Sequence, residues 1–256
     1  MIREDGRSTD GLRALSCELG VLTSTDGSAR FRAGLTSALA SVHGPRPAQS
    51  ARFEDAERAR LEVHVAPAAG AAGAREAELA VFLRQALAPL IVLTASPRAV
   101  ITVGVHVQSD DGGAAAVAFN AAVLALADAG VPLRAIAGAV ALARASDGGL
   151  LVDPTRDEVC GRAGAGAPAR ATLTAAFDEV NANAGDAPIA MFAAGARRRG
   201  SLTSDLRAAA AASVRVISFS RAVLAGKVQR DAVNCAPEVR AALAGAARAS
   251  ADMTDE

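Results

Sequence analysis

Two short stretches of this sequence carry the residue types best suited to chemistry. Asp153, Asp157 and Glu158 lie close together after a predicted strand, and such carboxylates can bind a divalent metal or act as general acid and base. Gly112 and Gly113 precede an apolar stretch, where the backbone N–H groups at the start of a helix can hold an anion. On residue types alone, a solvated acidic loop and a simple helix cap are the commoner explanations.

Basic residues gather in a second region. It contains Arg46, Arg52, Arg58 and Arg60, with acidic residues between them. This pattern fits either a loop that contacts phosphate or a loop that is simply solvated, and the solvated loop is the more typical. The run Arg197–Arg199 has no neighbouring acids, but such runs are commonly surface segments. The three histidines have no spaced partner and are expected in the core or at a sheet edge rather than as ligands; they are His43, His64 and His106.

Composition narrows the function classes. The chain has 27 basic and 27 acidic residues, so nucleic-acid binding must come from local patches and not from a net field. It has no Trp or Tyr, which argues against a series of base-stacking platforms. Three distant cysteines give neither metal-ligand spacing nor a disulfide framework. With no signal-like segment and no convincing membrane span, we expect a soluble intracellular protein.

The central structural element predicted is a strand followed by a buried helix. Ala99–Val107 is rich in β-branched residues and alternates, which predicts a strand. Gln108–Gly113 is turn-like and offers Asp110 or Asp111 as a helix cap. Ala114–Ala129 is apolar on all sides, so it predicts a helix at the centre of the domain.

The remaining pattern has strands in runs, which predicts an α+β fold. We expect strands at Leu12–Leu22, Ala29–Ala33, Thr36–His43, Leu61–Val65, Gly138–Arg144, Leu150–Asp153 and Arg170–Phe177. We expect helices at Arg75–Leu90, Pro132–Ala137 and Ser201–Lys227. Ala182–Gly200 is of low complexity. The predicted division is an N-terminal arm over residues 1–11, one domain over 12–231 and a flexible tail over 232–256.

Several sequence strings resemble those of the RNase PH family. The most characteristic are DGSARFRAGLTSALASVHGP and LALADAGVPLRA, and the similarity covers Arg13–Arg230. This resemblance implies a single RNase PH-like domain, with mixed β-sheets packed on the buried Ala-rich helix and a long C-terminal helix. It also implies a hexameric ring, built through strand-pairing dimers, with RNA in a central channel. Active members degrade RNA from its 3′ end by phosphate attack on the terminal phosphodiester.

Within the family, other strings resemble those of ring subunits of the eukaryotic RNA exosome. They are CELGVLTSTDGSARF, SDDGG, FNAA and LVDPT. The partners that this resemblance implies are other RNase PH-like ring subunits, RNA-binding cap subunits and RNA, with no membrane and no cofactor. The implied location is the nucleus, nucleolus and cytoplasm.

Departures from the family pattern bear on activity. Ala115 stands where active members carry a phosphate-holding arginine, Ala74 replaces the first of two arginines and leaves only Arg75, and Val159 stands at the place of the catalytic acid. A slip of one or two residues would instead bring Asp157 or Glu158 into register.

We therefore expect a ring subunit without catalysis, in which Arg46, Arg52 and Arg75 contact RNA or make salt bridges to ring neighbours. The alternatives are an active phosphate-dependent 3′-to-5′ exoribonuclease that uses Asp157, Glu158 and Arg75, and a self-associating scaffold outside the exosome.

Overall fold

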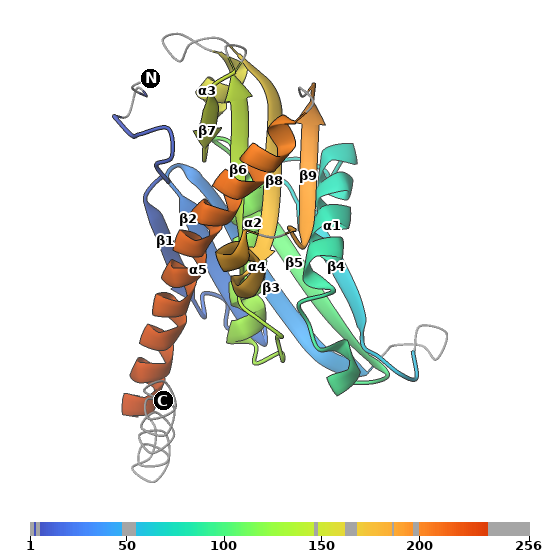
Figure 1. Ribbon diagram of the computed structural model, residues 1–256. Helices are drawn as coiled ribbons and strands as arrows, with labels where there is room; N and C mark the ends of the chain where they lie inside the picture. Colours follow the sequence, from blue (N-terminus) through green and yellow to red (C-terminus); the bar gives the residue numbers. More distant parts are fainter. Residues whose placement is uncertain are drawn as a thin grey trace.

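The structure is a computed structural model, and it describes residues 3, 6–47, 55–145, 148–161, 168–185, 187–196 and 200–234. Two β-sheets pack against one central helix, α2 (Ala114–Asp128), and a long helix, α5 (Ser201–Asn234), crosses the second sheet (Figure 1). This arrangement confirms the predicted α+β architecture with a buried Ala-rich helix and a long C-terminal helix.

The first sheet has five strands in the order β1-β2-β3-β5-β4. Their bounds are β1 Leu15–Leu19, β2 Gly27–Ala33, β3 Thr36–Pro47, β4 Arg60–Ala66 and β5 Ala99–Ser109. The first three strands form an antiparallel meander, whereas β4 lies parallel to β5 because helix α1 (Ala74–Leu87) connects them. Buried residues alternate along β2 and β3, and this buried side faces α2.

Helix α2 lies between the sheets because it has no polar side to expose. Ten apolar residues from Ala116 to Leu126 are buried, together with Asn120. The Asn120 side chain accepts a hydrogen bond from the N–H of Ala139 (2.8 Å) and donates one to its carbonyl (3.0 Å). This buried polar side chain near the middle of the helix therefore fastens it to the second sheet.

The second sheet has the order β7-β6-β8-β9 and is antiparallel. Its strands are β6 Ala137–Ala145, β7 Leu150–Val152, β8 Ala169–Asp178 and β9 Ala190–Gly195. Helices α3 (Arg156–Cys160) and α4 (Glu179–Ala184) follow β7 and β8, and a short 3₁₀ helix covers Leu93–Ala95. Helix α1 lies beside both β4 and β9, so it links the two sheets at one side of the molecule (Figure 1).

Four sequence predictions need correction. Residues 132–137 are not helical, because Leu133 bridges to Ile91 and β6 starts at Ala137. The low-complexity stretch contains the strand β9, and the acidic stretch contains the helix α3. Gly113, rather than Asp110 or Asp111, occupies the N-cap position of α2.

The ends of the chain are described only in part. In the predicted arm, the Arg3 side chain is buried and paired with Glu158. At the other end, α5 continues to Asn234, so the first residues assigned to the tail are helical, and residues 235–256 lie outside the described part.

Helix α5 is long and apolar enough over Ser201–Ala232 to cross a membrane by length and composition alone. A core helix of a folded domain meets the same criteria. In this chain α5 packs along β6 and α4, and its buried residues include Ala209, Ala212 and Val216. The apolar composition of α5 is therefore explained by its packing on the second sheet.

Candidate functional site

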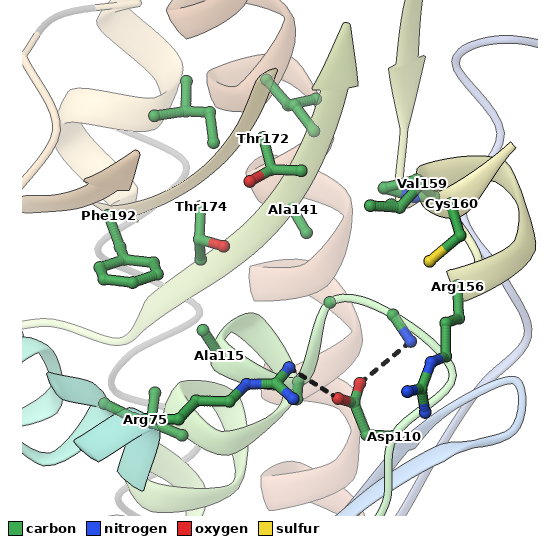
Figure 2. A pocket seen from close by; sticks show the side chains of 17 residues that line it. Arg75, Asp110, Ala115, Ala141, Arg156, Val159, Cys160, Thr172, Thr174 and Phe192 are labelled. Carbon is green, nitrogen blue, oxygen red and sulfur yellow. Dashed lines mark hydrogen bonds and ion pairs between the residues drawn. The ribbon is translucent and has the colours of Figure 1, made fainter. Parts of the chain in front are cut away.

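A cleft of about 370 Å³ opens where the turn between β5 and α2 meets α1, α3, β8 and β9 (Figure 2). Segments far apart in the sequence line it. They contribute polar residues Arg75, Asp110, Arg156, Cys160, Thr172 and Thr174, and apolar residues that include Leu79, Ala115, Val159 and Phe192. A pocket of this size, with apolar walls and a few polar groups, is typical of a small-molecule site.

The turn before α2 has a fixed shape because glycine is required there. Gly112 has φ +94°, and a Cβ atom at this position would lie 2.6 Å from the carbonyl oxygen of Pro154. The Thr36 hydroxyl donates to the Gly112 carbonyl (2.8 Å) and accepts from the N–H of Asp111 (3.0 Å). The turn is therefore held between β3 and the segment that leads into α3.

Arg75 and Asp110 meet at the mouth of the cleft. An Arg75 guanidinium nitrogen lies 2.9 Å from Asp110 Oδ2, and the Asp110 Oδ1 accepts from the N–H of Gly112 (3.0 Å). The Arg75 side chain is 77% exposed. An ion pair so open to water adds little stability, so Arg75 can exchange Asp110 for an anionic ligand.

A buried ion pair lies behind the turn. The Arg13 guanidinium donates to Asp153 Oδ1 (2.6 Å) and to the carbonyls of Asp111 and Gly112 (3.1 and 3.0 Å). Asp153 has φ +50°, which is uncommon for a residue with a side chain. The backbone N–H of Arg13 also donates to its carboxylate (2.9 Å), so this conformation is held in place by hydrogen bonds.

A second buried ion pair fixes α3. Arg3 Nε lies 2.7 Å from Glu158 Oε1, and the same carboxylate accepts from the N–H of Thr155 (2.8 Å). Burial raises the pKa of Glu158, but the Arg3 hydrogen bond, the Thr155 N–H and the charges of Arg3 and Arg7 together hold that pKa below its usual value. Glu158 is therefore committed to anchoring α3.

Three positions identified from the family resemblance lie together in the structure. At two of them the sequence departs from the family pattern, and at the third it keeps the family residue. Ala115, Val159 and Arg75 all line the cleft. Ala74 is the first residue of α1, next to Arg75. Asp157 and Glu158 are not among the lining residues of the cleft, although they belong to the same short helix as Val159.

The other predicted RNA contacts lie elsewhere. Arg46 is near the end of β3, opposite Val100 at the start of β5, whereas the cleft lies beyond the far end of β5. The two places are therefore roughly 30 Å apart along the strand. Arg46 is exposed and lies 3.2 Å from Asp26, whose pKa is lowered by the N–H of Gly44 and then by Arg46. Arg52 and the run Arg197–Arg199 lie outside the described residues.

The structure does not support the hypothesis that Asp153, Asp157 and Glu158 together bind a divalent metal ion. Within the described ranges, no group of three or more His, Cys, Asp or Glu side chains is arranged to hold a metal. Asp153 and Glu158 are each paired with a buried arginine instead.

Several cleft residues were not proposed as functional from the sequence; they include Arg156, Cys160, Thr172, Thr174 and Phe192. Arg156 directly precedes the predicted acidic residues Asp157 and Glu158, and this basic charge beside two acids is the sequence feature that could have identified it. Phe192 is in the Ala-rich stretch that hid β9, so neither a motif nor a periodic pattern marked it.

Known proteins resemble this chain in sequence. The family model described as the 3′ exoribonuclease family, domain 1, of RNase PH matches residues 11–132. The chain is 38% identical over 156 residues to the Exosome complex exonuclease RRP46 homolog of Arabidopsis thaliana, which covers 61% of this chain and 65% of that protein. The chain thus spans slightly less than two thirds of this relative. It is 36% identical over 171 residues to the Exosome complex component Rrp41 of Thermococcus gammatolerans, covering 62% of this chain and 68% of that protein.

Solved structures resemble it in fold. Rice Rrp46 superposes with a TM-score of 0.77 at 30% identity, and the match covers 87% of this chain and all of that chain. The Archaeoglobus fulgidus exosome with RNA bound to the active site gives a TM-score of 0.67 at 21% identity, covering 86% of this chain and 91% of that chain, which shows a shared fold alone. From these sequence and structural matches, the chain belongs to the RNase PH family.

Proposed function

We propose that this chain is a non-catalytic ring subunit of an RNA exosome that supports 3′-to-5′ RNA processing and degradation. Its contribution is to build the ring and to line the RNA channel. The observation that carries this proposal is that Ala115 and Val159 lie in one cleft with Arg75. Two of the three departures from the family pattern therefore fall in the same cleft.

The chemistry explains why these two changes matter together. Phosphate attack on a phosphodiester needs cationic donors for the phosphate and an acidic group that acts in the transfer. The methyl group of Ala115 and the isopropyl group of Val159 neither donate a hydrogen bond nor carry charge. Loss of one such group typically costs about 100- to 1,000-fold in rate, so the remaining Arg75 cannot sustain the reaction.

The alternative that Asp157 or Glu158 replaces the lost acid has less support. Glu158 is tied to Arg3 and to the Thr155 N–H, and Asp157 does not line the cleft. A carboxylate must reach the reacting atoms to act as a general acid or base. The anchored carboxylate of Glu158 and the place of Asp157 outside the cleft lining therefore support the non-catalytic proposal.

The relatives support the choice of complex. Their printed names refer to the exosome complex, which makes other RNase PH-like ring subunits, RNA-binding cap subunits and RNA the proposed partners of this chain. Arg46, Arg52 and Arg75 are the proposed RNA contacts. We also propose that the protein acts in ribosomal RNA maturation and RNA turnover in the nucleus, nucleolus and cytoplasm.

The catalytic part of the proposal is tested by an RNA degradation assay. The purified chain is incubated with a 3′-hydroxyl RNA, with and without inorganic phosphate and magnesium, and nucleoside diphosphates are measured. We expect no phosphate-dependent release. Release that is lost in the variant Asp157→Asn would establish the active-enzyme alternative instead.

The assembly part needs a separate experiment. The tagged chain is purified from its own cells, and the proteins that accompany it are identified. Co-purification of other RNase PH-like subunits in one complex is expected. A stable homodimer without those subunits would favour the scaffold alternative.

A further inference from the structure

The outer face of the first sheet carries a group of histidines. Val103 and Val105 are buried toward α2, so the residues that alternate with them along β5 lie on the opposite face of the sheet. His106 and His64 are exposed on the neighbouring strands β5 and β4 (Figure 1), and His43 is half-buried on β3. All three histidines of the chain therefore lie on one sheet face, and none lies in the core.

Two of these histidines are available to a partner. The helices that contact this sheet do so from its buried side, as shown by Phe219 of α5, whose ring packs against the buried Phe31 of β2. Within the described part of the chain, His64 and His106 make no hydrogen bond or ion pair. His43 differs, because its Nδ1 is buried without a hydrogen-bond partner among the described residues. His64 and His106 are therefore the imidazoles that a bound molecule would meet.

The spacing of His64 and His106 suits an extended chain. His64 lies opposite Gly104, and His106 follows Gly104 by two residues on β5. From the distance between strands and the rise per residue, their Cα atoms are roughly 8 Å apart. Alternate side chains of an extended segment point the same way and are roughly 7 Å apart. Two such side chains of one segment can therefore contact both imidazoles.

The surroundings of the two histidines favour a negatively charged partner. Ser41 and Thr102 are uncharged, and Gly104 adds no side chain between them. The other charged residues around this face are mostly paired with one another; they are Arg60 with Glu62, Arg30 with Glu18, Arg46 with Asp26, and the unpaired Arg32. Imidazoles gain positive charge as the pH falls from about 8 to about 5, and that added charge has no acidic partner assigned to it in this arrangement.

We propose that the outer face of the first sheet binds an extended acidic segment of a protein partner, and binds it more tightly at mildly acidic pH. Two carboxylates at alternate positions of the segment accept hydrogen bonds from His64 and His106. A protein segment is favoured over RNA because, among the described residues, no Phe lies on this face to stack on bases. The proposal goes beyond the proposed function, since it uses neither the cleft residues nor an RNA contact.

The test is fluorescence polarisation of the full chain with a labelled peptide of alternating Glu and Thr residues. Between about pH 7.5 and about pH 6, the affinity is expected to rise about tenfold, because both imidazoles gain charge. His64→Gln and His106→Gln each keep a polar side chain but cannot gain charge, and each should reduce the rise about threefold. The double variant should show no rise. A peptide with Gln in place of Glu should not bind at either pH.

Two variants serve as matched controls. His43→Gln removes the third histidine of the same face, whose Nδ1 is enclosed, and should keep most of the rise. Arg230→Ala removes a positive charge from the exposed surface of α5, where Arg230 Nε bonds to the carbonyl of Gly226 in its own helix, and should bind the peptide as the unaltered chain does. Thermal unfolding of every variant identifies any that fails to fold.

The result that would overturn the inference is an affinity that is equal at both pH values, or a rise that the double variant retains. Competition by an unstructured RNA that displaces the peptide and responds to the same two histidines would also overturn it, because the face would then be a nucleic-acid site. None of these outcomes bears on phosphate-dependent cleavage or ring co-purification, so a failure here is distinguishable from a failure of the proposed function.

Discussion

At the scale of single residues, the site shows which positions support its shape and which would supply its chemistry. Arg13 and Asp153 fix the turn before α2, and Arg3 and Glu158 fix α3. These ionic residues are buried and hydrogen-bonded, whereas Ala115 and Val159 stand at the places that the family resemblance assigns to the phosphate-holding arginine and the catalytic acid. Under the proposed function, the chain keeps the frame of the cleft without the groups that would react within it.

The buried Arg3–Glu158 pair predicts a large mutational effect. Glu158→Gln removes the charge that compensates Arg3, whose side chain is 1% exposed, and breaking such a buried pair costs about 3–5 kcal/mol. Urea unfolding at neutral pH measures this loss. The matched control is Glu18→Gln, which breaks the partly exposed pair with Arg30 and should cost less than about 1 kcal/mol. Equal costs for the two variants would contradict the assignment.

The same carboxylate predicts an acid-dependent loss of stability. Because the pKa of Glu158 is lowered from its ordinary value of 4.5 in the folded chain, its contribution is fully present above pH 4.5 and is lost as the pH falls through the lower folded pKa. The unfolding free energy should fall below pH 4.5, and Glu158→Gln should show a smaller part of that fall. A variant with the same acid dependence as the unaltered chain would show that other carboxylates cause it.

At the scale of elements, the sequence predicted those whose pattern is strong and local. The alternation in β2, β3 and β5 and the uniformly apolar α2 are both consequences of which faces are buried. Strand β9 was missed because its Ala-rich sequence has no alternation, and it is held in place by pairing with β8. Residues 132–137 were misassigned because their extended form depends on the bridge from Leu133 to Ile91.

The residues of the candidate site also differ in whether the sequence could predict them. Arg75, Ala115 and Val159 could be predicted because family strings locate them along the chain. Thr174 and Phe192 could not, because they reach the cleft only through the pairing of β8 with β9. Contacts made through sheet pairing depend on the whole fold and leave no mark in a short stretch of sequence.

Two glycines in different surroundings predict opposite changes in stability when each is replaced by alanine. A Cβ atom at Gly27 would lie 2.3 Å from the backbone nitrogen of Ala129, so Gly27→Ala should destabilise the fold by about 3 kcal/mol. Gly226, within α5, has open space around it, and Gly226→Ala should stabilise by about 0.5–1 kcal/mol. Thermal and urea unfolding measure both. If both substitutions destabilised the fold, the close approach of α2 to Gly27 would not explain the loss of stability.

At the scale of the whole molecule, charge limits how the chain can contact RNA. Its 27 basic and 27 acidic residues cancel, and the exposed arginines Arg46 and Arg75 are partly neutralised by Asp26 and Asp110. For the proposed RNA binding, a chain without a net field must rely on a few local contacts and on the proposed ring partners.

This charge balance predicts a weak dependence of RNA binding on salt. Each neutralised phosphate of a single strand adds about −0.7 to the slope of log affinity against log salt concentration. The two proposed contacts within the described residues, Arg46 and Arg75, therefore give a slope of about −1.4, and the third proposed contact, Arg52, would bring it to about −2.1. Fluorescence anisotropy with a labelled RNA measures it between low and moderate salt. Arg46→Ala and Arg75→Ala should each make the slope shallower by about 0.7, while Arg230→Ala should leave it unchanged. A slope several times steeper, or one that neither substitution alters, would mean that the single chain binds RNA through a basic surface other than these two places, and the positions of the RNA contacts would have to be reassigned.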